Sequence, residues 1–375
     1  MFKKTLAAVA VLGAFAGSAM AANVTLYGIV DEALQYSYVK ANGGEKQDTY
    51  GIRSGNQNGS RWGVKGQEEL GNGLIAGFQL ESGFSADDGK LGQNNRLFGR
   101  VASMYLKGGF GTLAAGRDGG LASGLGTVSF LYNYVALGTG WGAYAGSNSL
   151  FNFSYRDRAD NTLTYVTPDF GGVKVYAQYS FQADGQELPD SGDNTRYAAL
   201  GVNYTGGAFN TGLVVDQLFK PTDADDQFTV SYGANYDFGA AKVYGMAQYG
   251  KHMDNVVNYK FTHDKFTHEK TTYLGLGVGD YTGYNVGLGV SAPVAGGTFY
   301  AQANYVYGKD KTEGADAKVD GYGVGLAYSY PLSKRTSVYT YGAYNQFKTK
   351  GVDSIVEDGA KTKIGEVGLG LTHKF

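Results

Sequence analysis

The stretch QFTVSYGANY at residues 227–236 indicates the fold class. Every even position in it is apolar or aromatic, and every odd position is small or polar. Because successive side chains of a β-strand point to opposite faces, this pattern predicts a strand with one apolar and one polar face. It places Val230 on the apolar face and Ser231 on the polar face, toward water.

The same alternation recurs along the chain, at residues 74–81, 298–307 and 321–330 among others. No stretch after residue 21 sustains an apolar stripe with the helical period of 3.6 residues. None approaches the roughly 18 consecutive apolar residues that a membrane helix needs. The pattern therefore predicts an all-β protein.

The lengths of the segments and of their connections favour a membrane barrel over a soluble sandwich. The segments have about 10 to 12 residues, near the length of strands that cross a bilayer, and many carry Tyr or Phe at their ends. Seven short connections alternate with eight long ones. The short ones lie at 71–73, 108–110, 168–172, 206–207, 237–239, 293–297 and 331–335, and the long ones near 39–59, 84–95, 118–155, 182–194, 219–225, 251–280, 309–318 and 348–361. We expect a 16-stranded antiparallel transmembrane β-barrel, although residues 270–292 could contain a further segment.

Composition narrows the functional classes. The chain has 60 glycines in 375 residues and no cysteine, which excludes disulfides, thiolate zinc sites and cysteine nucleophiles. Its 32 basic residues against 34 acidic ones argue against a nucleic-acid partner. A barrel of sixteen strands is too wide for its wall side chains to fill, so we expect a water-filled channel without a cofactor.

The first 21 residues have the features of an export signal. Lys3 and Lys4 precede an apolar core, and Ala19-Met20-Ala21 forms a small-residue cleavage site. We therefore expect residues 1–21 to be a signal peptide and residues 22–375 to form the outer-membrane barrel.

Four stretches carry a resemblance to a known family. They are VTLYGIVD (24–31), SRWGVKGQEELGNGL (60–74) continuing to FQLE (78–81), the segment 100–117 with GGFGT at 108–112, and the C-terminal VGLGLTHKF (367–375). The chain resembles the general diffusion porins of Gram-negative bacteria, in the trimeric branch typical of Neisseria and β-proteobacteria.

The resemblance implies a location, a function and partners. A protein of this type would lie in the outer membrane of a Gram-negative bacterium, in contact with its lipid, as a homotrimer. It would be a passive channel for small hydrophilic solutes and ions, and not an enzyme. The terminal Phe375 would be the signal that the barrel-assembly machinery reads.

Strand alternation and the resemblance together predict the residues of the pore. Alternation places Arg61, Lys65 and Glu81 on the lumen side, with Arg156 and Arg158. Related porins carry an arginine cluster on the wall opposite acidic groups near the third loop. The predicted pore-constriction residues are Arg61, Arg100, Arg156, Arg158, Lys65, Glu81 and Asp118.

The long connection at about 118–155 is apolar and aromatic, and residues 119–155 carry no charged side chain. An exposed loop of this composition would be an aggregation-prone patch. We therefore expect it to fold inward as a constriction loop, as in the family; an external loop used for subunit packing is the alternative. With arginines on the wall and no loop carboxylates, we expect a mild anion preference, and a pore that hardly selects is the alternative.

Three other interpretations of the sequence compete with this one. A solute-specific channel would use the aromatic loop as a path for one solute. A barrel enzyme would need acid/His or Ser/His groups that converge, and His252, His263 and His268 lie in one loop without an evident partner. Two histidines of the tandem KFTHD-KFTHE at 260–269 could bind a metal, but a slipped duplication explains them better. We expect no metal site.

Overall fold

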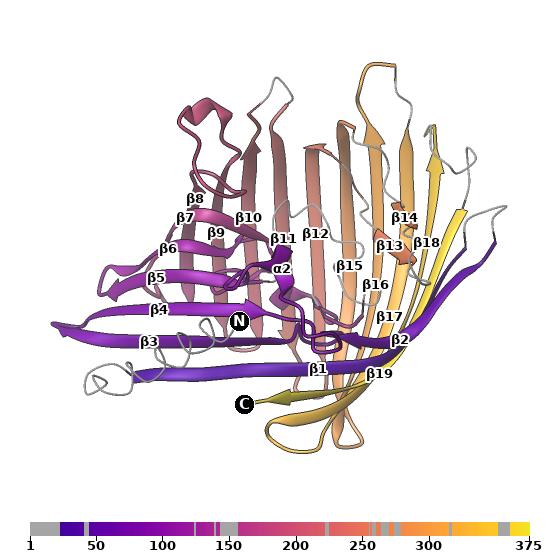
Figure 1. The fold of residues 1–375 in the computed structure, drawn as a ribbon, viewed down its shortest axis with the longest axis horizontal. Coiled ribbons are helices and arrows are strands. Elements are labelled where there is room, and N and C mark those ends of the chain that lie inside the picture. Colours follow the sequence, from indigo (N-terminus) through magenta and orange to yellow (C-terminus); the bar gives the residue numbers. More distant parts are fainter. Residues whose placement is uncertain are drawn as a thin grey trace, which may run out of the picture.

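The computed structural model describes residues 23–40, 45–123, 125–138, 140–142, 157–221, 225–254, 256, 260–263, 270–273, 279–314, 317–351 and 361–375. Within these residues, seventeen strands form one sheet and two short strands form a separate hairpin (Figure 1). The expected signal peptide and Arg156 lie outside the described residues. No helix in the described part of the chain has the length and apolar character to cross a membrane.

The elements follow one another with few helical turns. The strands of the sheet are β1 (Asn23–Lys40), β2 (Gln47–Ser54), β3 (Arg61–Gly71), β4 (Leu74–Gly83), β5 (Val101–Gly108), β6 (Gly111–Gly119), β7 (Arg158–Val166), β8 (Val173–Ser180), β9 (Arg196–Gly206), β10 (Phe209–Phe219), β11 (Gln227–Asp237), β12 (Lys242–Met253), β15 (Tyr281–Val294), β16 (Gly297–Asp310), β17 (Lys318–Pro331), β18 (Thr336–Lys350) and β19 (Lys361–Lys374). The hairpin is β13 (Lys260–His263) with β14 (Lys270–Tyr273), and the helical turns are α2 (Gly92–Asn95), η1 (Leu131–Tyr134) and η3 (Ser191–Asp193).

The sheet closes on itself through β1. One edge of β1 pairs with β19, and the other pairs with β2 at residues 32–39 and with β3 at residues 23–29. Because β2 and β3 lie end to end along β1, the seventeen strands fill sixteen positions of a closed antiparallel barrel. The predicted 16-stranded barrel is confirmed.

Two details differ from the sequence-based expectation. The expected long connection at 39–59 contains β2, whose side chains are almost all exposed and therefore lack the alternation of a half-buried strand. The uncertain stretch 270–292 does contain an extra strand, β14, but it pairs with β13 alone and takes no position in the wall.

The outer face of the barrel is apolar. Leu34, Met104, Leu200 and Leu288 point outward and are 61–70% exposed, whereas their neighbours Ala33 and Ala199 are buried on the inner side. Apolar side chains exposed around a closed sheet match the hydrocarbon of a bilayer, where every backbone polar group needs a partner within the protein.

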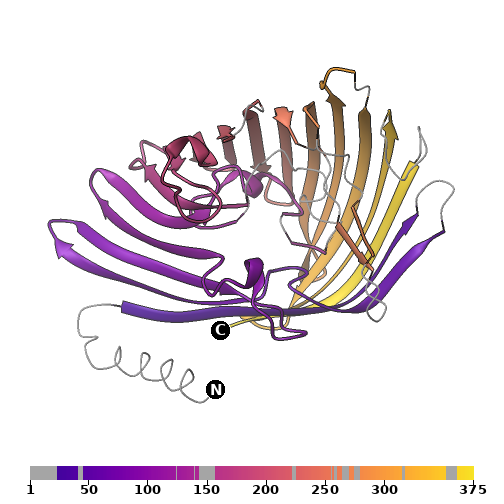
Figure 2. The same ribbon diagram turned by 45° about the horizontal axis from the view of Figure 1, so that its top comes forward.

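The inner face is only partly open to water. Ser231, expected to face water, is fully buried and accepts a hydrogen bond from Gln248 Nε2 at 3.0 Å. The reason is that a chain segment between β6 and β7 lies inside the barrel against β9–β12 (Figure 2). Alternation distinguished the two faces of the wall correctly, but it could not show which part of the inner face is covered.

Candidate pore constriction

The infolded segment, residues 120–123, 125–138 and 140–142, packs against glycines of the wall. A Cβ atom at Gly201 would lie 2.9 Å from the ring of Phe130, and one at Gly233 would lie 2.6 Å from Tyr134. Farther along, a Cβ atom at Gly289 would lie 2.6 Å from the Cβ atom of Ala136. Any larger residue at these wall positions would displace the segment. Burial in this contact raises the pKa of the Tyr134 hydroxyl to about 12, so that it stays protonated and neutral.

Hydrogen bonds hold the same segment across the lumen. Leu137 N donates to Gln302 Oε1 at 2.8 Å, and Asn235 Nδ2 donates to the carbonyl oxygen of Asn133 at 3.1 Å. The ring of Trp141 stands edge-on to Tyr339 at 5.8 Å between ring centres. The infolded segment is thus fixed to strands from β11 to β18, which narrows the lumen.

A second segment, residues 55–60, connects β2 to β3 and also turns inward. The Asp31 carboxylate on β1 accepts hydrogen bonds from the backbone N–H groups of Gln57 (3.2 Å) and Asn58 (3.1 Å). The carbonyl of Asn56 in turn accepts a hydrogen bond from Gly142 N at 2.8 Å, at the far end of the infolded segment. We call residues 55–60 the inner brace. Sequence reasoning missed it, although the run SGNQNGS at 54–60 is typical of a turn.

The two infolded segments and the wall enclose a cavity of about 520 Å³, the constriction cavity. Arg61 at the start of β3, Arg100 just before β5 and Arg158 at the start of β7 all line it. Glu81 of β4 and Asp157 are the acidic residues in its lining. The wall thus brings three predicted arginines and the predicted glutamate together.

Glu81 is the centre of this group. Its Oε1 lies 2.6 Å from Arg100 Nε, and its Oε2 lies 3.9 Å from Arg61 Nε. Arg158 Nε donates to the backbone carbonyl of Arg100 at 2.8 Å, so this third arginine bonds to a neutral acceptor. Glu81 therefore pairs with two arginines, and the lining as a whole sets three arginines against two carboxylates, Glu81 and Asp157, so positive charge is left over.

Two of the predicted residues lie elsewhere. Asp118 is buried at the end of β6, where it accepts hydrogen bonds from Gly119 N (2.7 Å) and Thr127 N (2.8 Å). Instead of lining the cavity, it anchors the start of the infolded segment. Lys65 points into the lumen from β3, over the ring of Tyr27, but it is not part of the cavity lining.

A further ion-pair group behind the cavity was not predicted. Asp160 on β7 lies 2.8 Å from Arg96 Nη1 and 2.7 Å from Arg117 Nη1. Arg96 belongs to the connection after α2, so no strand pattern could assign it a face. This group neutralises most of its own charge, so the excess of positive charge belongs to the cavity lining, where three arginines stand against Glu81 and Asp157.

Comparisons with known proteins agree with this architecture. A family model described as Gram-negative porin matches residues 7–351. An outer membrane porin protein of Bordetella pertussis is 34% identical, and outer membrane porin protein 32 of Delftia acidovorans is 31% identical, each over the full length of both chains. The solved anion-selective porin from Comamonas acidovorans has a TM-score of 0.65 at 28% identity, covering 94% of this chain and all of that one. The chain belongs to the Gram-negative porin family.

Membership of the porin family indicates the membrane in which the barrel lies and its general function. This porin is a passive channel through the outer membrane of a Gram-negative bacterium, as the resemblance in the sequence predicted.

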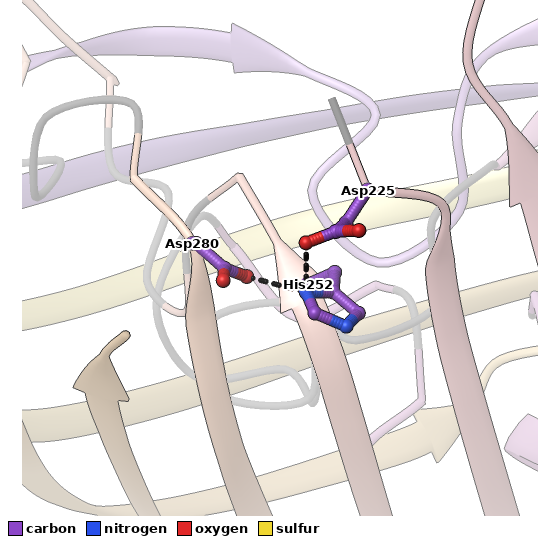
Figure 3. A group of neighbouring side chains, drawn as sticks. All are labelled: Asp225, His252 and Asp280. Atoms are coloured by element: carbon purple, nitrogen blue, oxygen red, sulfur yellow. Dashed lines mark hydrogen bonds and ion pairs between the residues drawn. The ribbon is translucent and has the colours of Figure 1, made fainter. Parts of the chain in front are cut away.

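At the long-loop end of the porin, three strand ends are linked by a charged group (Figure 3). His252 Nδ1, at the end of β12, lies 2.8 Å from Asp280 Oδ1 and 3.4 Å from Asp225 Oδ2. The same ring nitrogen faces both carboxylates, which suits a hydrogen-bonded link between the connections that flank β11, β12 and β15. Of the two tandem histidines, the side chain of His263 and the whole of His268 lie outside the described part of the chain.

Proposed function

We propose that this porin prefers anions mildly and that the arginines of the constriction cavity set this preference. The observation that carries the proposal is the excess of arginines over carboxylates where two infolded segments narrow the lumen. Fixed charges next to a low-dielectric wall act strongly on ions that pass close to them. The solved relative from Comamonas acidovorans is an anion-selective porin, which supports the same direction.

Reversal potential in a planar bilayer across a KCl gradient tests the proposal. We expect the wild-type potential to lie on the anion side, and we expect Arg61→Ala to move it toward the cation side because Glu81 then keeps one arginine fewer. Arg335→Ala, in the short β17–β18 turn, is the matched control and should leave the potential unchanged. A wild-type channel without ion preference, or equal effects of both variants, would contradict the role of the cluster.

The proposed assembly is a homotrimer without enzymatic activity. The trimer rests on the family, and its test is the mass of the detergent-solubilised protein by light scattering, where a monomer mass would contradict it. Absence of catalysis is tested with a panel of peptides and phospholipids. Hydrolysis above the blank would favour the enzyme interpretation instead.

A further inference from the structure

A second and larger cavity lies next to the constriction cavity. Its volume is about 900 Å³, and it is lined by residues 127–130 and 132–135 of the infolded segment together with wall residues from β3 to β12. Gln79 lines both cavities, so the two are adjacent along the lumen. Its wall residues include several beside the short turns, such as Lys107 and Thr205. We call this cavity the vestibule; it occupies the short-turn side of the constriction.

Three lysines from separate strands point into the vestibule. Lys107 comes from β5, Lys174 from β8 and Lys242 from β12. No carboxylate is among the described residues that line the vestibule. Lys174 lies 4.0 Å from Asp169 in the neighbouring turn, while Lys107 and Lys242 form no ion pair within the described part of the chain. The vestibule therefore carries positive charge that the protein does not neutralise within it.

The rest of the lining is rich in amides and tyrosines. The amide side chains are Gln67, Gln79, Asn133, Asn203, Asn210 and Asn235. Hydrogen bonds hold several of them in place: Asn210 Nδ2 donates to Asn235 Oδ1 at 3.1 Å, and the Tyr105 hydroxyl donates to Gln67 Oε1 at 3.2 Å. Each amide carries two donor hydrogens and an oxygen that can accept twice, so these bonds orient the amides without using their full hydrogen-bonding capacity.

We propose that the vestibule is a transit-binding site for hydroxylated organic anions of the sugar-acid class. The lysines would hold the carboxylate, the amides would exchange hydrogen bonds with the hydroxyls, and the tyrosine rings would cover the carbon face of the solute. Its volume falls within the range of small-molecule sites. This proposal rests on the proposed function as an open channel, and it adds a site separate from the arginines.

The composition of the vestibule lining favours sugar acids over two other classes of solute, inorganic anions and neutral sugars. A site for inorganic anions would need the lysines but not six amides, and a site for neutral sugars would need the amides but not three lysines. Because the fixed amides are already oriented, a hydroxylated anion would lose less entropy on binding than it would at a flexible surface.

The test is block of single-channel current by gluconate added to the short-turn side in about 0.1 M KCl, where charge is little screened. Glucose and acetate serve as probes that carry only hydroxyls or only a carboxylate. We expect gluconate to block at a lower concentration than either probe. In the double variant Lys174→Gln with Lys242→Gln, we expect the half-blocking concentration of gluconate to rise roughly tenfold or more. Lys251→Gln, on the exposed face of β12, should keep wild-type block.

The outcomes are distinguishable from a failure of the channel itself. Normal conductance with equal block by gluconate, glucose and acetate would overturn the vestibule site and leave the porin function intact. Unchanged gluconate block in the double variant would overturn it as well. A barrel without conductance would instead contradict the proposed function. Reversal potentials of the double variant show whether the arginines alone retain the anion preference.

Discussion

At the scale of single residues, Asp31 organises more of the lumen than any charged residue predicted for the constriction. It is fully buried on β1, and its carboxylate binds two backbone N–H groups of the inner brace. The hydroxyl of Tyr339 donates to it at 2.6 Å, and that of Thr372 donates to it as well. One side chain thus connects β1, β18 and β19 with the segment that supports the infolded loop.

Replacing Asp31 should loosen the constriction. In Asp31→Ala the Tyr339 hydroxyl and the N–H groups of Gln57 and Asn58 lose this acceptor, and leaving a buried donor such as that of Tyr339 unpaired costs about 1–3 kcal/mol. We expect a lower melting temperature and a noisier, larger single-channel conductance, because the inner brace is no longer fixed. Asp48→Ala, at an exposed site on β2, is the control. Wild-type conductance and noise in Asp31→Ala would show that the brace is held by other contacts.

At the scale of elements, the infolded segment and the wall fit each other through glycines. Gly201 and Gly212 accommodate the ring of Phe130, and Gly233 accommodates Tyr134. The backbone at each of these strand positions is one that any residue could adopt. Glycine is therefore needed here because a side chain would collide with the infolded segment, and not because of its conformational freedom. Packing of this kind fixes the loop without charged contacts, in keeping with its uncharged composition.

A larger side chain at a contact glycine should release the loop. In Gly233→Leu, the new Cβ would stand 2.6 Å from Tyr134, so the infolded segment must move. We expect a larger conductance and a weaker ion preference, measured in planar bilayers. For comparison, Gly245→Ala places its Cβ no closer than 3.7 Å to Leu288 and should conduct like wild type. Identical conductance of both variants would contradict the assigned packing.

The sequence predicted wall elements better than lumen contacts, for physical reasons. Strand alternation is local, so the faces of β3, β4 and β11 could be assigned from neighbouring residues alone. β2 was missed because it is exposed on both faces and carries no alternation. The brace depends on contacts between Asp31 and residues 26 and 27 positions away, and Asp118 turned inward to bind Thr127. Such contacts depend on how the chain closes in three dimensions.

At the scale of the whole molecule, the net charge of the chain and the net charge of the constriction cavity have opposite signs. The chain has a formal net charge of −2, yet arginines prevail at the narrow part of the lumen. An ion in transit responds to charges within a screening length, which is about 10 Å at 0.1 M salt and about 3 Å at 1 M. The average charge of the protein therefore says little about selectivity.

Ionic strength should accordingly change the selectivity. We expect the anion preference from reversal potentials to be clear when the mean KCl concentration is about 0.1 M and to fall at about 1 M. Arg61→Ala should reduce the low-salt preference and narrow the difference between the two conditions. A preference that is equal at both concentrations would point to pore size, rather than fixed charge, as its cause.

The closure of the barrel has a consequence for the order of events in biosynthesis. Next to β19, Phe375 exchanges backbone hydrogen bonds of 3.1 Å in both directions with Gly28 of β1, although β1 is translated long before β19. Until β19 is present, β1 lacks this partner, and its edge is open to pairing with other chains. A prematurely terminated product would keep that edge permanently. Pairing of β19 with β1 is thus the contact that closes the sheet and removes this open edge.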